Sequence, residues 1–195
     1  MLIKEKTFEE FESQHSQRNR KRDAWVESLK QHLGDDLIIA EIGVSVGVNS
    51  KRIVDILEPK EFYLIDPWNF DDYGPDLPIH KYMKDFVYHK LGNEECVHII
   101  EDYSYNALSN FPDETFDYIY IDGEHDYDNV MKDLICSYPK VKSGGLIGGH
   151  DYWETHEVIP AVNEFIKNKK IVDYSLPSNP ERGKDGNSDF FFVKM

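Results

Sequence analysis

The chain has few cysteines and no long apolar run. Only Cys96 and Cys136 occur among its 195 residues. They stand alone in or beside apolar segments, so the sequence predicts buried free thiols of a reducing compartment rather than a disulfide framework. No apolar stretch approaches about 18 residues, so we expect no membrane-spanning helix. Residues 1–6 show no apolar signal-peptide region, so we expect a cytoplasmic protein with no membrane partner.

Basic residues are scarce as well. The chain carries 22 Lys and Arg against 37 Asp and Glu, which gives a formal net charge of −15. Because phosphate neutralisation dominates nucleic-acid affinity, proteins that bind DNA or RNA usually carry a basic patch. We therefore expect no nucleic-acid partner. The acidic balance instead favours a small neutral or cationic molecule.

Aromatic residues are abundant, with 12 Tyr, 11 Phe and 3 Trp. Such a chain has ample apolar area to bury, which argues against disorder. The length suits one domain with a single core. No internal repeat, low-complexity tract or linker divides the chain.

Five short apolar runs predict the strands of an open sheet. They lack the alternation of a half-exposed strand, as expected for parallel strands buried on both faces. The spacing between them leaves room for crossover helices. The fold class is therefore α/β, with a mostly parallel Rossmann-like sheet and helices on both faces. The runs are Leu37–Ile42, Phe62–Ile65, Val97–Ile100, Phe116–Ile121 and Leu146–Gly149.

Helical patterns lie before and between these runs. Apolar spacing predicts a helix over 22–33, ended by Gly34, and a second helix that Asn49-Ser50 caps and that stops near Pro59. A third helix begins at Asp126 or Asp128 and ends near Pro139, and a fourth covers 158–166. The segment 189–193 predicts a late antiparallel C-terminal strand added to the parallel set.

Polar residues follow each predicted strand at its carboxyl end. In an open α/β sheet these ends form the ligand crevice. The clusters are Glu41 to Gly47, Asp66, Glu101-Asp102, Asp122 to His125, and His150-Asp151. We therefore expect one site built from all five strand ends.

The first turn reads Glu41-x-Gly43-x-Ser45-x-Gly47. Glycine lets a ligand approach the backbone closely, and Asp66 can accept hydrogen bonds from a ribose diol. The dinucleotide pattern G-x-G-x-x-G is not matched, which disfavours a nicotinamide-dependent oxidoreductase without excluding it. A plain strand-to-helix turn and a non-catalytic cofactor-binding module also stay open. The proline- and aromatic-rich segment 67–78 is predicted to be an ordered loop beside this crevice.

The sequence resembles class I S-adenosylmethionine-dependent methyltransferases at three places, namely the first turn, Asp66 and the stretch from Phe116 to Asp151. The most similar branch ends its fourth strand in Ile-Asp-Gly-x-His and begins its fifth after Gly-Gly. The resemblance covers roughly residues 37–170. It implies a single methyltransferase domain over 1–195, with an N-terminal helical segment over 1–34 and a Rossmann-like core over 37–195.

The resemblance also implies contacts to S-adenosyl-L-methionine. Glu41 would lie near the methionine amino end, and Asp66 would bind the ribose hydroxyls. The turn residues Gly43, Ser45 and Gly47 would wrap the methionine and ribose. Asp102 and Tyr103 would flank the adenine. Ser45 stands where many relatives have glycine.

Sugar O-methyltransferases of this branch hold a divalent metal with acids after strands four and five and use a nearby histidine as the base. The resemblance implies Asp122, His150 and Asp151 as ligands and His125 as the base, with His150 as the second candidate. That subgroup has an acid where this chain has His150. Mg²⁺ prefers oxygen ligands, whereas a nitrogen ligand favours a softer ion such as Mn²⁺, so the ion and its use stay open.

The expected function is methyl transfer from S-adenosyl-L-methionine to a small-molecule acceptor, foremost a hydroxyl oxygen of a sugar or natural product. Asp122, His125 and Asp151 are expected to converge in one pocket. Two carboxylates that close repel unless a cation or a charged histidine lies between them. The oligomeric state, a homo-oligomer included, is left open by the sequence.

Overall fold

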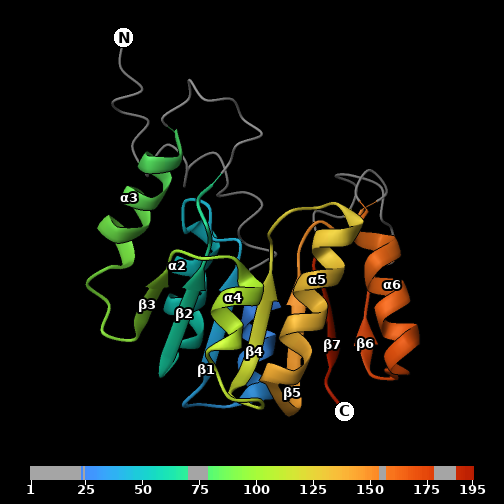
Figure 1. Ribbon diagram of the computed structural model, residues 1–195. Helices are drawn as coiled ribbons and strands as arrows, with labels where there is room; N and C mark the ends of the chain where they lie inside the picture. Colours follow the sequence, from blue (N-terminus) through green and yellow to red (C-terminus); the bar gives the residue numbers. More distant parts are fainter. Residues whose placement is uncertain (1–22, 24, 70–78, 154–156, 178–187) are drawn as a thin grey trace.

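The computed structural model describes residues 23, 25–69, 79–153, 157–177 and 188–195 (Figure 1). The first residues of the predicted N-terminal helix and most of the predicted 67–78 loop lie outside the described residues. Residues 25–33 are helical. This helix ends as predicted at Gly34, which has φ +83° and donates its N–H to the Lys30 carbonyl at 2.9 Å.

Seven strands form one sheet in the order β3-β2-β1-β4-β5-β7-β6 (Figure 1). All neighbours pair in parallel except β7, which is antiparallel to both β5 and β6. The predicted α/β class with a late antiparallel C-terminal strand is confirmed. The strands are β1 (Ile38–Ile42), β2 (Glu61–Ile65), β3 (Val97–Ile100), β4 (Phe116–Ile121), β5 (Val141–Gly149), β6 (Tyr174–Ser175) and β7 (Phe190–Val193).

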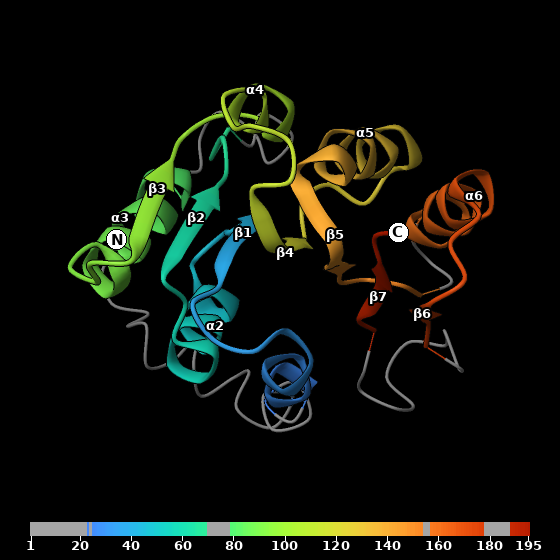
Figure 2. The same ribbon diagram turned by 90° about the horizontal axis from the view of Figure 1, so that it is seen from below.

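Helices cover both faces of the sheet, so the molecule has three layers (Figure 2). One face packs against α4 (Ser104–Ser109), α5 (Tyr127–Ser137) and α6 (Val158–Lys169). The other packs against residues 25–33, α2 (Val48–Leu57) and α3 (Ile79–Leu91). A short 3₁₀ turn, η2 (Tyr138–Lys140), joins α5 to β5. None of the helices in the described ranges is long and apolar enough to cross a membrane.

The two faces have separate cores because side chains alternate along each strand. In β4, Ile119 and Ile121 pack toward α5 and α6, whereas Tyr118 and Tyr120 pack toward α2. Strands buried on both faces need the near-continuous apolar sequences from which they were predicted.

Some details of the sequence prediction were wrong. Asn49 and Ser50 do not cap α2, because the N-cap is Gly47 in the left-handed region and no side chain caps the helix. Strand β5 begins at Val141 rather than Leu146. Val141 is buried, but Lys142, Ser143 and Gly144 after it are partly or fully exposed and interrupt the apolar run. The helices α3 and α4 and the two-residue β6 were not predicted. Both cysteines are free, but they are half-buried rather than buried.

Candidate active site

The carboxyl ends of β1, β2 and β4 open into a cavity of about 510 Å³. Strands β1 and β4 are neighbours whose following strands lie on opposite sides of the pair. Such a switch point leaves a crevice at the strand ends, which is where open α/β sheets bind ligands. Besides the strand ends Ile42 and Ile65, the lining residues are Gly43, Ser45, Asp66, Pro67, Asn69, Tyr103, Ser104, Tyr105, Asp122, Gly123, Glu124, His125, Asp126, Asn129, Lys132 and Asp133.

The turn after β1 is held tightly against β4. Gly43 has φ +80°, and a Cβ added to it would lie 2.1 Å from the carbonyl oxygen of Asp122. Only glycine fits such a contact. Two residues further on, Ser45 has φ 53°, the left-handed conformation that glycine adopts more readily. The turn therefore keeps its backbone next to the cavity, with Ser45 in a conformation that glycine adopts more readily.

Asp66 fixes the same turn from the neighbouring strand. Its Oδ2 accepts hydrogen bonds from the amides of Val44 at 2.8 Å and Ser45 at 2.9 Å. Its Oδ1 accepts one from the amide of Trp68 at 2.6 Å. Burial raises the pKa of Asp66, and these backbone hydrogen bonds oppose the rise. Asp66 thus lines the cavity as predicted and also orders the backbone around it.

Of the other predicted cofactor residues, Tyr103 lines the cavity, whereas Glu41, Gly47 and Asp102 do not. Glu41 is buried, and its carboxylate accepts hydrogen bonds from Asn49 Nδ2 at 2.9 Å and from the Ser50 hydroxyl. Gly47 begins α2. Asp102 Oδ1 accepts the amide of Tyr103 at 2.8 Å, and Tyr103 itself lines the cavity. Glu41 therefore anchors the start of α2 under the glycine turn.

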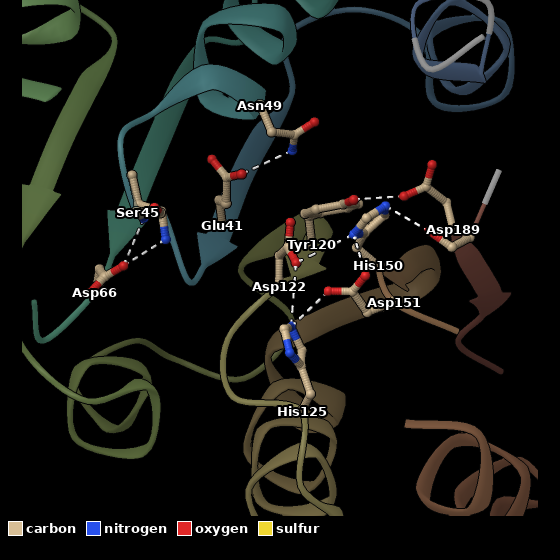
Figure 3. A network of polar contacts seen from close by, with 12 residues as sticks. Glu41, Ser45, Asn49, Asp66, Tyr120, Asp122, His125, His150, Asp151 and Asp189 are labelled. Carbon is tan, nitrogen blue, oxygen red and sulfur yellow. Dashed lines mark hydrogen bonds and ion pairs between the residues drawn. The ribbon is translucent and has the colours of Figure 1, made fainter. Parts of the chain in front are cut away.

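The polar residues after β4 and β5 converge at one end of the cavity (Figure 3). His125 Nε2 lies 2.8 Å from Asp151 Oδ2 and 4.0 Å from Asp122 Oδ1. His150 Nδ1 lies 3.1 Å from Asp151 Oδ1 and 3.7 Å from Asp122 Oδ1. Asp122, His125 and Asp151 thus lie close together as predicted, but they do not all line one pocket. Asp122 and His125 line the cavity, whereas His150 and Asp151 lie behind them.

The charges of this cluster compensate one another. Burial would raise the pKa of Asp151, but its contacts with His125 and His150 outweigh burial and hold that pKa well below its usual range. Contact with Asp151 in turn raises the pKa of His125 against the opposing effect of burial. Two histidines thus lie between the carboxylates, which is the arrangement that two close acids require.

The segment before β7 supports the cluster from behind. Ser188 Oγ lies 2.7 Å from His150 Nε2. Next to it, Asp189 Oδ1 accepts a hydrogen bond from the Tyr120 hydroxyl at 2.7 Å. These contacts hold His150 and bind the C-terminal segment to β4 (Figure 3).

Several of these residues were not found by sequence reasoning. Ser188 and Asp189 lie in a segment with no motif, so no local pattern marks them. Ser104, Lys132 and Asp133 line the cavity between α4 and α5. One signal was present for Asp133, because this acid stands among the apolar residues by which α5 was recognised.

The donor set of the cluster fits a divalent metal. The ligand atoms of Asp122, His125 and Asp151 lie within 4.8 Å of one another. His150 Nδ1 lies at similar distances from the same two carboxylates, 3.1 Å from Asp151 Oδ1 and 3.7 Å from Asp122 Oδ1. The two carboxylates together with either histidine are therefore close enough to surround one ion. Two carboxylates and an imidazole suit Mn²⁺ better than Mg²⁺.

Known proteins match the chain in sequence and in fold. The model of a family described as "Methyltransferase domain" matches residues 40–152. Protein R132 of Acanthamoeba polyphaga mimivirus, which is uncharacterised, is 29% identical over 149 residues, covering 72% of this chain and 64% of that protein. The chain thus spans slightly less than two thirds of that relative.

Two solved structures share the fold. The O-methyltransferase NovP is 18% identical with a TM-score of 0.62, over 90% of this chain and 80% of that chain. SMU.1697c of Streptococcus mutans, solved in complex with SAH, is 12% identical with a TM-score of 0.66, over 91% of this chain and 98% of that chain.

Proposed function

The chain belongs to the methyltransferase-domain family, and we propose that this S-adenosylmethionine-dependent methyltransferase methylates a hydroxyl oxygen of a small molecule such as a sugar or natural product. The observation that carries the proposal is the continuity of one cavity. The same space is lined by the glycine turn and Asp66 and by Asp122 and His125. A cofactor held at the turn therefore shares a cavity with Asp122 and His125.

The turn and Asp66 supply the cofactor-binding end. Gly43 and Ser45 line the cavity, and the hydrogen bonds that the amides of Val44 and Ser45 donate to Asp66 fix the turn. A preformed turn costs little ordering free energy when a ligand binds. It directs the methionine part of the cofactor toward β4.

His125 supplies the base. Methyl transfer breaks the bond between the sulfonium sulfur and the methyl carbon and forms a bond from that carbon to the acceptor oxygen. The acceptor hydroxyl loses its proton, which the neutral form of the His125 imidazole takes up at Nδ1, because Nε2 faces Asp151. Asp151, 2.8 Å from Nε2, stabilises the imidazolium that forms. His125 is preferred over His150 because His125 lies on the cavity wall.

Asp122, Asp151 and His150 are the residues that would hold a divalent ion while His125 acts as the base. Such an ion, when bound, acts as a Lewis acid that lowers the pKa of a hydroxyl. The fold itself brings His150 Nδ1 to 3.1 Å from Asp151 Oδ1 and 3.7 Å from Asp122 Oδ1. Ser188 keeps His150 in place through its other nitrogen, as the second shell of a metal site does.

The size and charge of the cavity support a small acceptor. Asp66, Asp122, Glu124, Asp126 and Asp133 line it, with Lys132 as a basic neighbour. Acids around the crevice favour the cationic sulfonium and disfavour polyanions such as nucleic acids. Family membership decides against the nicotinamide-dependent oxidoreductase that the first turn alone left open.

The test is turnover on a panel of hydroxyl compounds. The chain is incubated with S-adenosylmethionine and with monosaccharides, sugar glycosides, catechols and amines, and mass spectrometry detects S-adenosylhomocysteine and methylated product. We expect a methyl ether from at least one hydroxyl compound. Methylation of amines alone would contradict the oxygen acceptor, and binding of the cofactor without turnover on any compound would favour the non-catalytic module.

A further inference from the structure

Glu157 connects the two segments that carry the proposed base and its carboxylate. His125 lies between β4 and α5, whereas Asp151 and Glu157 lie between β5 and α6. The amide of Glu157 donates a hydrogen bond to the His125 carbonyl at 3.1 Å. Its side-chain Oε2 accepts a hydrogen bond from the amide of Tyr127 at 2.9 Å. Glu157 therefore holds the backbone at His125 itself and again two residues after it.

These two hydrogen bonds lie at helix ends. Tyr127 is the first residue of α5, and Glu157 is the N-cap of α6. The first amides of a helix have no partner within that helix, so their acceptors come from elsewhere. Asp126, the N-cap of α5, accepts the amide of Asn129, which leaves the amide of Tyr127 to Glu157. A carboxylate is also favourable at this end of a helix because of the helix dipole.

The same two segments also meet through their side chains. His125 Nε2 lies 2.8 Å from Asp151 Oδ2. This distance depends on where the backbone of each segment lies, and the hydrogen bonds of Glu157 fix one backbone against the other. A catalytic group that is misplaced by 1 Å can cost about 10²-fold in rate. Glu157 itself is exposed and is not among the residues that line the cavity, so its effect reaches the reaction through His125.

We propose that Glu157 is a positioning residue for His125, an inference that rests on the proposed function. Its side chain fixes the start of α5 and thereby sets the distance between the imidazole and Asp151. Loss of this side chain slows methyl transfer without weakening the cofactor, because the glycine turn and Asp66 follow other strands. A role in stability alone would lower the free energy of unfolding and leave kcat unchanged.

The experiment measures steady-state kinetics of two Glu157 variants on the acceptor found in the panel. Glu157→Ala removes the acceptor of the Tyr127 amide, and kcat should fall at least about tenfold while KM for S-adenosylmethionine stays within about twofold. Glu157→Gln keeps a side-chain oxygen that accepts a hydrogen bond, so kcat should return to within about threefold of wild type.

Glu164→Ala is the matched control. Glu164 lies on α6 and forms a hydrogen bond with the Tyr127 hydroxyl, so it joins α6 to the same residue. This contact is made to the side chain of Tyr127 and leaves the backbone at His125 untouched. Glu164→Ala should therefore keep the wild-type kcat and KM.

Amide hydrogen exchange, measured by NMR, tests the contact without turnover. Exchange at the Tyr127 amide should be at least about tenfold faster in Glu157→Ala than in the wild-type chain, and unchanged in Glu164→Ala. If thermal unfolding shows that Glu157→Ala is not folded, Glu157→Asp takes its place, because its carboxylate is one methylene shorter and should change exchange and kcat in the same directions.

The outcomes separate this inference from the proposed function. Unchanged exchange at Tyr127 in the folded variant, or a wild-type kcat despite faster exchange, overturns the role of Glu157 alone. If the wild-type chain methylates no compound of the panel, the proposed function fails, and the positioning role fails with it.

Discussion

His125 Nε2 lies 2.8 Å from Asp151 Oδ2, although the two residues follow different strands. The parallel pairing of β4 with β5 brings their ends together, with Ile121 opposite Gly149. Asp151 has φ 57°, an uncommon conformation for a residue other than glycine. Strain of this kind persists only where surrounding contacts hold it, and it concentrates at functional sites. The pair is the centre of the proposed chemistry.

The first prediction concerns this pair. His125→Gln removes the proposed base, and Asp151→Asn removes the carboxylate that stabilises its charged form. Each should lower kcat by about 10²–10⁴-fold, the usual contribution of a general base, with little change in cofactor affinity. Steady-state kinetics on the acceptor found in the panel measures this. His98→Gln is the control, because His98 lies on β3 and pairs with Glu61. If the His125→Gln variant keeps the wild-type kcat, His125 is not the base.

The second prediction compares two glycines. Gly34 and Gly43 both have positive φ, but an added Cβ at Gly34 meets nothing within 4 Å. Gly34→Ala should therefore cost about 1 kcal/mol of unfolding free energy from backbone strain. Gly43→Ala should cost about 1–3 kcal/mol more and weaken binding of S-adenosylhomocysteine, because its methyl group collides with the Asp122 carbonyl. Urea unfolding and calorimetry measure the two effects. Equal costs would mean that the turn is not tightly packed against β4.

The third prediction concerns the metal. Titration of the metal-free protein with Mn²⁺ should show about one bound ion, with weaker binding of Mg²⁺. His150→Ala and Asp122→Asn should each weaken Mn²⁺ binding at least about tenfold, whereas His125→Gln should retain it. His98→Ala serves as the control. Absence of binding of Mn²⁺, Mg²⁺ and Zn²⁺, together with full turnover after chelation, would rule out a metal in this site.

The fourth prediction is a pH dependence of stability. Burial raises the pKa of Asp133 from 3.8 to about 6, so the folded chain binds a proton there that the unfolded chain has lost. Asp133 therefore lowers the free energy of unfolding as pH rises from about 4 to about 6, by roughly 3 kcal/mol. The Asp133→Asn variant has no carboxyl to titrate at this position. The free energy of unfolding of the variant minus that of the wild type should therefore increase by roughly this amount between pH 4 and pH 8. Urea unfolding at both pH values checks this, and a constant difference would contradict it.

Much of the fold followed from the sequence, because parallel strands buried on both faces must be short apolar runs. The polar site residues could be predicted because they follow these apolar runs. The carboxyl ends of parallel strands lie along one edge of the sheet, so residues at those ends come together. Helix α3 was missed although Met83, Val87 and Leu91 have helical spacing. Helix α4 has six residues, too few for a periodic pattern.

The supporting contacts of the site could not be predicted. Ser188 reaches His150 across 38 positions, and Asp189 reaches Tyr120 across 69. No local pattern encodes such contacts, since they depend on where β7 enters the sheet. The contact of Glu41 with the methionine amino end, which the resemblance implies, stays a prediction. The hydrogen bonds that Asn49 and Ser50 donate to its carboxylate could not be predicted from the sequence.

The central claim is that the cofactor lies in the strand-end cavity with its sulfur toward His125. A crystal structure of the chain soaked with S-adenosylhomocysteine tests this most directly. We predict that the methionine part lies along Gly43 and Ser45, that the ribose lies beside Asp66, and that the sulfur faces Asp122 and His125. A cofactor bound outside this cavity, or inside it with the sulfur directed away from His125, would contradict the account.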